Sequence, residues 1–406
     1  MYNSLPIDDW FDENEVPFSE PINDQQCSRL FASITYTERL SFFRQWVKLR
    51  SEREYIAYDV TSVSTYSQGI DWAEWGYNRD YDNLPQINIG MFFGSESRLP
   101  VYYNVYSGSI TDKSHLKFMM DGAEELGINC VRFVMDRGFV TEDNLLYMAE
   151  KELLFVTAFP GNLLEAKRII DENRGNIRKA INRLSQFDVY AATTDVNLYG
   201  LGLKAHIYFD AEKQVMDEKE LYAHIDRLEA ELVKLGRGKR ASKRFTDFFT
   251  ITQEKSDMFS YTPNNEKIDE RLGRAGFFIL LSNDPNLTSG ELLGIYRGKD
   301  VIEKSFDQFK NGLDFKRLRT HFNDTTEGKV FVGFIALILR SYLLSRIKDN
   351  PDTKQLTLEK VLLECRKIRA VSLNNLSRML MPLTKIQRTI LEAIGVSSSN
   401  IMELFA

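Results

Sequence analysis

The sequence has few of the residues that build disulfide frameworks or zinc sites. Among 406 residues there are three cysteines, far apart and odd in number: Cys27, Cys130 and Cys365. This spacing suits neither a set of disulfides nor a cysteine-based zinc site, and a cytoplasmic location is expected. The four histidines also lack metal-ligand spacing and are predicted to lie at the surface or to cap an element: His115, His206, His224 and His321.

The sequence pattern predicts no leader segment, no membrane-spanning run and no phosphate-binding loop. Residues 1–9 contain no basic residue and no apolar run, so no signal peptide is expected. The most apolar segment, Val330–Leu344, is interrupted by Arg340. It is too short to span a bilayer, so we expect a buried helix and no membrane contact. No Walker-type or dinucleotide-binding glycine motif occurs.

The chain has no overall excess of positive charge. Its formal net charge is −6. This argues against a general, non-selective polyanion-binding protein, because such proteins are usually basic overall. From Tyr296 to Arg319, however, seven Lys and Arg residues stand against four Asp and Glu residues. Basic sites on this acidic chain would therefore have to act locally.

What is present is the composition of a folded α/β protein of two or three domains, with 43% hydrophobic and 12% aromatic residues. A helical pattern at 27–54 precedes three strands, a helix, a strand, a helix and a strand, expected at 55–60, 86–93, 100–106, 115–126, 130–135, 141–151 and 153–158. A long excursion follows, with short strands at 187–209, turns at Asp195 and Gly200, and a polar helix at 218–235. A strand at 276–281 then precedes a helix, and the chain from 328 onward is expected to be helical.

The segment from Tyr296 to Lys310 is expected to form one amphipathic helix. Its apolar residues recur about every three to four positions: Ile295, Ile302, Phe306 and Phe309. A second set recurs at offsets of 3, 4 and 7 and is expected to point one way: Tyr296, Lys299, Glu303 and Lys310. A carboxylate between two lysines and a tyrosine suits a metal ion and a phosphate backbone. An ordinary helix with ion pairs between adjacent turns is the alternative.

Three acids occupy particular places in this order of elements. Asp59 lies near the end of the first expected strand, Asp136 directly follows the fourth, and Glu303 lies on the late helix. Strand-end carboxylates of an open α/β sheet face the crevice in which ligands bind. Carboxylate oxygens suit Mg²⁺ or Mn²⁺, and two such ions about 3.5–4 Å apart can promote in-line displacement at phosphorus. A turn or helix-capping role is the alternative for any one of these acids.

Three segments resemble the DDE transposases of bacterial insertion sequences: Asp59-Val-Thr-Ser62, Asp136-Arg-Gly-Phe139 and Tyr296–Lys310. The last is similar to a subgroup with a Tyr-x2-Arg-x3-Glu-x6-Lys signature, but Lys299 stands at the Arg position. Lysine grips a phosphate differently from arginine. The adjacent Arg297 points about 100° away on a helix. The resemblance covers residues 27–350.

This resemblance implies a ribonuclease-H-like mixed sheet flanked by helices, interrupted by a largely β insertion domain and followed by a helical C-terminal region. The expected boundaries are an N-terminal arm and helix at 1–54, a catalytic domain at 55–186 and 276–350, the insertion at 187–275 and the C-terminal region at 351–406.

The resemblance also implies roles for individual residues. Asp59, Asp136 and Glu303 would be catalytic and would hold two Mg²⁺ or Mn²⁺ ions. The residues expected to contact DNA are Tyr296, Arg297, Lys299, Lys310, Arg317, Arg319 and Arg137. The partner would be double-stranded DNA, cleaved at transposon ends and joined through the freed 3′-hydroxyl to target DNA, by a homodimer once two ends are synapsed.

Two alternatives remain open at this point. A catalytically inactive, DNA-binding relic of such a transposase would explain Lys299 and the short, acidic region before the first expected strand. A ribonuclease-H-like nuclease without strand transfer would use the same acids.

Overall fold

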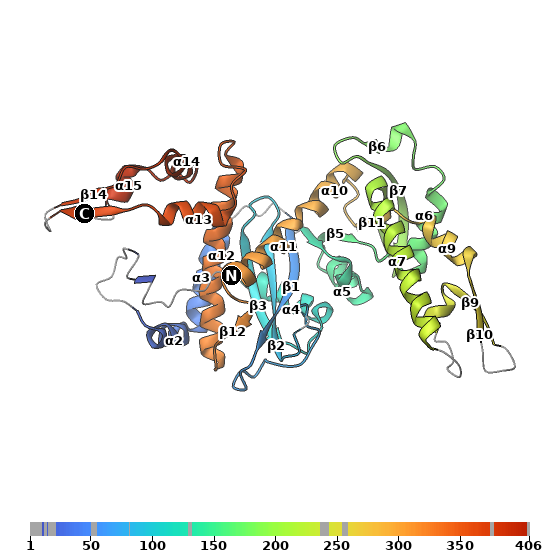
Figure 1. The fold of residues 1–406 in the computed structure, drawn as a ribbon, viewed down its shortest axis with the longest axis horizontal. Helices are drawn as coiled ribbons and strands as arrows, with labels where there is room; N and C mark the ends of the chain where they lie inside the picture. The colour runs from blue at the N-terminus through green and yellow to red at the C-terminus, as the bar shows by residue number, and fades with distance from the viewer. Residues whose placement is uncertain are drawn as a thin grey trace. The chain divides into compact units, whose positions relative to one another are not determined.

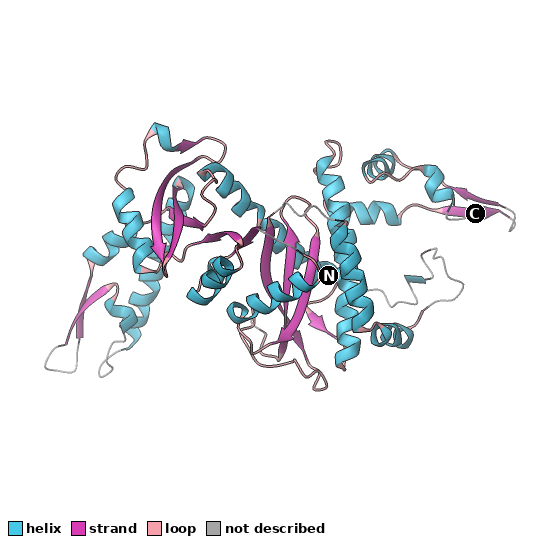
Figure 2. Ribbon diagram, turned by 180° about the vertical axis from the view of Figure 1, so that it is seen from behind, coloured by secondary structure: helices cyan, strands magenta, loops and turns pink. Residues whose placement is uncertain are grey.

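The computed structural model describes residues 10–11, 14, 22–49, 55–80, 82–128, 132–235, 243–253, 259–373 and 377–403. They form two compact units, one built from the stretches Met1–Val131 and Gly298–Ala406, the other from Arg132–Arg297. Figures 1 and 2 show their helices and strands. Cys130 and most of the expected N-terminal arm lie outside the described residues.

The first unit combines a mixed sheet with covering helices. The described strands of its sheet are β1 (Ile56–Thr65), β2 (Gln86–Gly94), β3 (Pro100–Ser107) and β12 (Arg317–Leu318). The helices around the sheet are α2 (Asp24–Ser33), α3 (Tyr36–Lys48), α4 (Asp112–Glu125), α11 (Asp300–Asp307), the π-helix η3 (Gln308–Gly312) and α12 (Asn323–Asp349). Nearer the C-terminus lie α13 (Leu358–Arg366), β13 (Ala370–Leu373), β14 (Ser377–Leu380), α14 (Lys385–Ala393) and α15 (Ser398–Glu403).

Strand β1 pairs with both β2 and β12. It pairs antiparallel with β2, which places Asp59 opposite Met91, and its end pairs in parallel with β12, which places Ser64 opposite Arg317. Strand β2 in turn pairs antiparallel with β3. Every residue of β2 is buried, and Asp59 is the one residue of β1 that is partly exposed. The expected strands at 86–93 and 100–106 are confirmed.

Helices α3 and α12 pack on β3 through aromatic rings. Phe43 of α3 and Phe334 of α12 both contact Tyr103, with ring centroids 5.6 and 5.0 Å away. Helices α12 and α2 pack very closely at Gly328, where a Cβ atom would lie 1.9 Å from the carbonyl oxygen of Phe31. Only glycine allows the two backbones to approach so closely.

Helix α12 is 27 residues long. Its length and its mean hydropathy of 1.8 over the most apolar window would by themselves allow it to cross a membrane, and 39% of that window is buried. Phe331, Phe334 and Leu337 lie in the core of the unit. The expected buried helix is thus present, and polar residues extend it beyond Val330–Leu344 at both ends.

The prediction that the whole region after α12 is helical is wrong, because two strands interrupt its helices. Strands β13 and β14 form an antiparallel hairpin, with Ala370 opposite Leu380. After this hairpin the next helix is α14. Ile347, Leu358, Val361 and Ile390 form a small separate core that joins α12, α13 and α14.

The second unit carries the long excursion of the chain. Its strands are β4 (Arg132–Met135), β5 (Leu154–Ala158), β6 (Arg183–Leu184), β7 (Val189–Leu198), β8 (Leu201–Phe209), β9 (Phe249–Gln253), β10 (Phe259–Pro263) and β11 (Phe277–Ser282). Its helices are η1 (Arg137–Phe139), α5 (Glu142–Glu150), α6 (Leu164–Asn173), η2 (Ala180–Asn182), α7 (Ala211–Leu235), α8 (Lys243–Thr246), α9 (Asn265–Leu272) and α10 (Ser289–Gly298).

The main sheet of this unit is mixed. Strands β4 and β5 are parallel, and β5, β11, β8, β7 and β6 follow in antiparallel pairs. The predicted strands at 153–158 and 276–281 are confirmed. Asp195 does not form a turn as expected, because it lies inside β7 opposite Lys204. The turn comes at Tyr199 and Gly200, both with positive φ.

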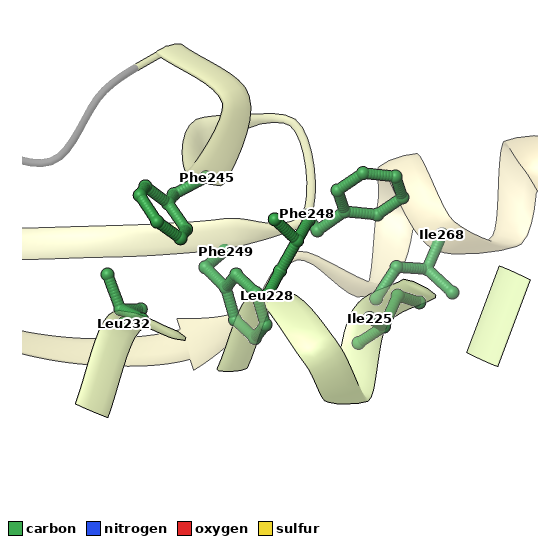
Figure 3. Packing of buried hydrophobic residues seen from close by; sticks show 7 residues of the cluster. All are labelled: Ile225, Leu228, Leu232, Phe245, Phe248, Phe249 and Ile268. Carbon is green, nitrogen blue, oxygen red and sulfur yellow. The ribbon is translucent and has the colours of Figure 1, made fainter. Parts of the chain in front are cut away.

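The expected insertion at 187–275 is mixed rather than largely β. Its longest element is the 25-residue helix α7, and α8 and α9 are also helical. Figure 3 shows the phenylalanine rings around β9 lying over residues of α7 and α9. This cluster consists of Ile225, Leu228, Leu232, Phe245, Phe248, Phe249 and Ile268. It gives this part of the second unit its own apolar core.

Replacing Phe249 by Ala is expected to lower the free energy of unfolding of this unit by about 3–5 kcal/mol, because the ring is fully buried and its loss leaves a cavity. Urea unfolding followed by circular dichroism would measure the change. Val233→Ala, at an exposed position of α7, serves as control and should change stability by no more than about 0.5 kcal/mol. Similar losses for both variants would contradict the placement of this core.

Two histidines are buried, contrary to the expectation of surface or capping positions. His115 stacks on Tyr106 with ring centroids 3.6 Å apart, and its Nε2 has no hydrogen-bond partner among the described residues. His206 shares its Nδ1 with the hydroxyls of Thr193 and Ser289. Burial lowers the pKa of each imidazole to about 4. Both positions were missed because a single histidine in a mixed pattern gives no sign of burial.

The buried histidines predict a loss of stability in mild acid. The folded pKa of about 4 lies below the unfolded value of about 6.5. The contribution of the neutral histidines to the free energy of unfolding is therefore fully present above pH 6.5 and is lost as the pH drops toward 4. Each buried histidine should lower the free energy of unfolding at pH 5 by about 2 kcal/mol. Unfolding in urea at pH 7 and pH 5 tests this: His115→Phe should reduce the pH dependence, whereas His224→Phe, at an exposed position, should not.

Candidate active site

Asp59 lies inside a strand, not near its end as the sequence suggested. It is the fourth of ten residues of β1, because the polar Thr61 and Ser62 continue the strand instead of closing it. Its Oδ1 accepts a hydrogen bond from the backbone N–H of Val60 at 2.8 Å. The Nη2 of Arg79 lies 4.0 Å from the same oxygen. The carboxylate is thus placed beside a guanidinium on an otherwise buried strand.

Arg79 is a neighbour of Asp59 that the sequence analysis did not identify. Its Nη2 donates to Oδ2 of Asp112 at 2.7 Å, and Tyr106 donates its hydroxyl to the other oxygen of Asp112 at 2.9 Å. The backbone N–H of Arg79 donates to Oγ of Ser62. Only the fold brings these groups together, since no sequence period links residues 59, 79 and 112.

Asp136 follows β4 directly, as predicted. Its Oδ1 accepts from the backbone N–H of Arg137 at 2.8 Å, so it caps the short helix η1. The same oxygen accepts from the hydroxyl of Tyr296 at 3.3 Å. The capping role is therefore real, but it does not account for the tyrosine that reaches Asp136 from α10.

Glu303 lies on α11, and the helix expected from Tyr296 to Lys310 is interrupted. Helix α10 ends at Gly298, α11 begins at Asp300, and η3 follows from Gln308. Glycine has a low helix propensity, which favours the break. Lys299 lies in the break and is buried, with 7% of its side chain exposed. Its Nζ is 3.4 Å from Oε1 of the largely exposed Glu303.

Lys310 and Arg317 are both held by carboxylates of the chain between β1 and β2. Lys310 donates to Oδ2 of Asp80 at 2.7 Å. Arg317 donates to both oxygens of Asp82 at 3.3 Å and to the hydroxyl of Tyr66 at 3.1 Å. The bond from Arg317 lowers the pKa of Asp82. These two cations, expected to contact DNA, already have anionic partners.

The remaining candidate contacts are more exposed. Arg297 lies 3.8 Å from Asp210 and over the ring of Phe187. Arg319 lies 3.4 Å from Asp314 with most of its side chain exposed. Arg137 is exposed, and no carboxylate among the described residues pairs with it. For these residues and for the buried Lys299, contact with DNA stays a prediction.

The three acids belong to different units. Asp59 and Glu303 lie in the first unit and Asp136 in the second. Within the described part of the chain, no group of three or more His, Cys, Asp and Glu side chains is placed to hold a metal ion. The donor set itself fits the oxygen chemistry of Mg²⁺ or Mn²⁺. Joint metal binding by these acids therefore stays a prediction.

Comparison with protein families identifies the chain. Residues 50–339 match the model of the transposase DDE domain, and the chain belongs to this family. No curated protein matches it.

Solved structures of transposase complexes are similar to a limited degree. The piggyBac transposase synaptic complex with hairpin DNA has a TM-score of 0.39 and 11% identity, covering 93% of this chain. The Drosophila P element transposase strand transfer complex has a TM-score of 0.19 and 12% identity, covering 96% of this chain and 75% of that one. The Mos1 mariner paired end complex has a TM-score of 0.18 and 11% identity over 34% of this chain and 44% of that one. This chain spans 59% of the length of the piggyBac chain.

The pair Lys310–Asp80 predicts a measurable coupling. Only 12% and 22% of their side chains are exposed, so removing one residue leaves the other as a mostly buried charge without its partner. Lys310→Met and Asp80→Asn should therefore each lower the free energy of unfolding by about 1–3 kcal/mol. In the double variant the loss should fall short of the sum by about 1 kcal/mol. Urea unfolding of the four proteins measures this.

The exposed pair Lys304–Asp300 on α11 is the matched control for this cycle. As an exposed pair on adjacent turns of a helix, its coupling should not exceed about 0.5 kcal/mol. Equal coupling in both cycles would show that Asp80 does not hold Lys310 in solution.

Proposed function

We propose that this protein is a DNA transposase of the insertion-sequence type with the Tyr-x2-Arg-x3-Glu-x6-Lys signature. It would cleave phosphodiester bonds at the ends of its element and join the freed 3′-hydroxyls to target DNA. The observation that carries the proposal is the hydrogen bond from Tyr296 to Asp136. Tyr296 belongs to the signature, and Asp136 is the second candidate acid. A helix that is only amphipathic does not require a contact between these two residues.

The order of elements supports a ribonuclease-H-like catalytic fold. Three antiparallel strands, β1 to β3, precede α4, and the parallel pair β4 and β5 flanks α5. Glu303 comes after the long excursion, on α11. The family match over residues 50–339 spans all of these elements.

The three acids would share one task. Asp59, Asp136 and Glu303 would hold two Mg²⁺ or Mn²⁺ ions, since all three supply carboxylate oxygens. When bound, such ions lower the pKa of a water or hydroxyl and neutralise charge on a phosphate. Around the acids, Tyr296 orients Asp136 and the buried Lys299 restrains Glu303.

The cationic residues would bind double-stranded DNA, both element ends and target. Phosphate contacts from Lys and Arg position a protein on a duplex without reading its sequence. The exposed side chains of Arg137, Arg297 and Arg319 are suited to this role. Synapsis of two ends would require a homodimer, and the reaction would take place in the cytoplasm.

A DNA-binding relic without cleavage is the second candidate. It is favoured by Lys299, which replaces the signature Arg and is directed at Glu303 instead of the surface. A nuclease without strand transfer would cleave but would not join, so a joining assay separates it from a transposase. Metal-stimulated cleavage separates both enzymes from the relic.

Glu303→Gln is expected to abolish metal-stimulated strand cleavage of DNA that carries the element ends. The loss should be at least about a hundredfold, since removing even an outer partner of a metal ligand costs up to that factor. Gel analysis of labelled strands with Mg²⁺ or Mn²⁺ measures it.

Asp300→Asn removes a carboxylate from the same helix, at an exposed position paired with Lys304, and should leave cleavage intact. Equal cleavage by the wild type and Glu303→Gln would refute the role of Glu303. Binding without cleavage by the wild type would favour the relic.

A further inference from the structure

Three of the charged residues in the chain between β1 and β2 contact or approach residues of the candidate site. We call the chain between Thr65 and Gln86 the β1–β2 loop. Asp80 accepts from Lys310 at 2.7 Å, and Asp82 accepts twice from Arg317 at 3.3 Å. Arg79 lies 4.0 Å from Asp59. Three charges of one loop are thus directed at a candidate metal ligand and two candidate phosphate contacts.

Hydrogen bonds between backbone groups and neutral side chains position this part of the loop. Arg79 donates its N–H to Ser62, and the side chain of Asn78 donates to Ser64, both on the strand that carries Asp59. The N–H of Asp80 donates to Oδ1 of Asn78 at 2.8 Å. The buried amide of Gln86 donates to the carbonyl oxygen of Tyr77. In the paired state these hydrogen bonds hold residues 77–80 of the loop beside β1 and β2.

A carboxylate and a DNA phosphate are alternative partners for the same cation. Both are anions that accept charge-assisted hydrogen bonds from Lys and Arg. Lys310 is almost buried against Asp80, so it cannot reach a phosphate while that pair is intact. Asp82 is ionised at neutral pH, as an aspartate ordinarily is, and the bond from Arg317 lowers its pKa further.

We propose that Asp80 and Asp82 determine the specificity of DNA binding by competing with phosphates for Lys310 and Arg317. DNA engages the site only when it displaces both carboxylates, and Arg79 leaves Asp59 in the same movement. Duplexes that offer phosphate charge alone are disfavoured, because part of the gain is lost in breaking the internal pairs. This inference rests on the proposed function, in which Lys310 and Arg317 contact DNA.

The test is the affinity of Asp80→Asn/Asp82→Asn for a short duplex of random sequence, measured by fluorescence anisotropy. Removing the two competitors should tighten binding about tenfold, since a pair that contributes up to about 1 kcal/mol opposes DNA by a factor of up to about five. The matched control is Asp71→Asn/Glu74→Gln, which removes two charges from the same loop at residues that pair with Asn323 and Ser109. This control should tighten binding less than about twofold, because the side chains of Asp71 and Glu74 are bonded to Asn323 and Ser109 and not to Lys310 or Arg317, and salt screens unpaired surface charges.

The outcomes distinguish a failure of the proposed competition from a failure of the proposed DNA contacts of Lys310 and Arg317. If Asp80→Asn/Asp82→Asn binds as the wild type does while Lys310→Gln/Arg317→Gln binds more weakly, the cations contact DNA but no competition exists. Equal tightening by both charge-removing variants would attribute the effect to net charge and overturn the inference. If Lys310→Gln/Arg317→Gln leaves affinity unchanged, the DNA contacts themselves are wrong and the inference falls with them.

Hydrogen exchange of the wild-type protein gives a readout that does not depend on how well the variants fold. Adding the duplex should speed exchange at the amides of Arg79 and Asp80, whose present acceptors are Ser62 and Asn78. Slower or unchanged exchange at both amides would show that the loop stays in place when DNA binds.

Discussion

The register of strand β1 is the constraint on which the first unit depends. From Ile56 to Ser64 it pairs with β2, and at Ser64 and Thr65 it pairs with β12. Because side chains alternate along a strand, a slip of one residue would turn every side chain to the opposite face. The same register therefore fixes Asp59, the serines that anchor the β1–β2 loop, and the strand that presents Arg317. One set of backbone hydrogen bonds positions a carboxylate, its neighbours and a cation together.

The acidic character of the chain acts through individual pairs. Lys299, Lys310 and Arg317 each have a carboxylate partner, and only Arg317 keeps much of its side chain exposed. A count of basic residues therefore overestimates what is offered to a polyanion. In a protein with a net charge of −6, internal carboxylates compete with any outside anion. Local geometry, and not composition, decides which cations are available.

Sequence patterns predicted the elements whose signal is local. Runs of β-forming residues identified β2, β3, β5 and β11, and the acid after β4 was placed correctly. Asp59 was misplaced because Thr61 and Ser62 resemble the end of a strand, although pairing with β2 buries them. The pairing of Arg79 with Asp59 and Asp112 could not be predicted, because it depends on how a loop folds back onto a strand. The burial of Lys299 has the same origin, since tertiary packing overrides a helical pattern that looks amphipathic.

The first unit is assembled from two stretches of chain with the whole second unit between them. During synthesis the N-terminal parts of a protein emerge first, and domains generally fold as units. Strand β3 would then lack its contact with Phe334, and β1 would lack its pairing with β12. Both would form only after more than 150 further residues had been synthesised. A ribosome that stops within the second unit releases a chain with neither Glu303 nor the helix that covers β3. Incomplete copies thus lack the second stretch of the first unit and, with it, one of the two acids that this unit would bear.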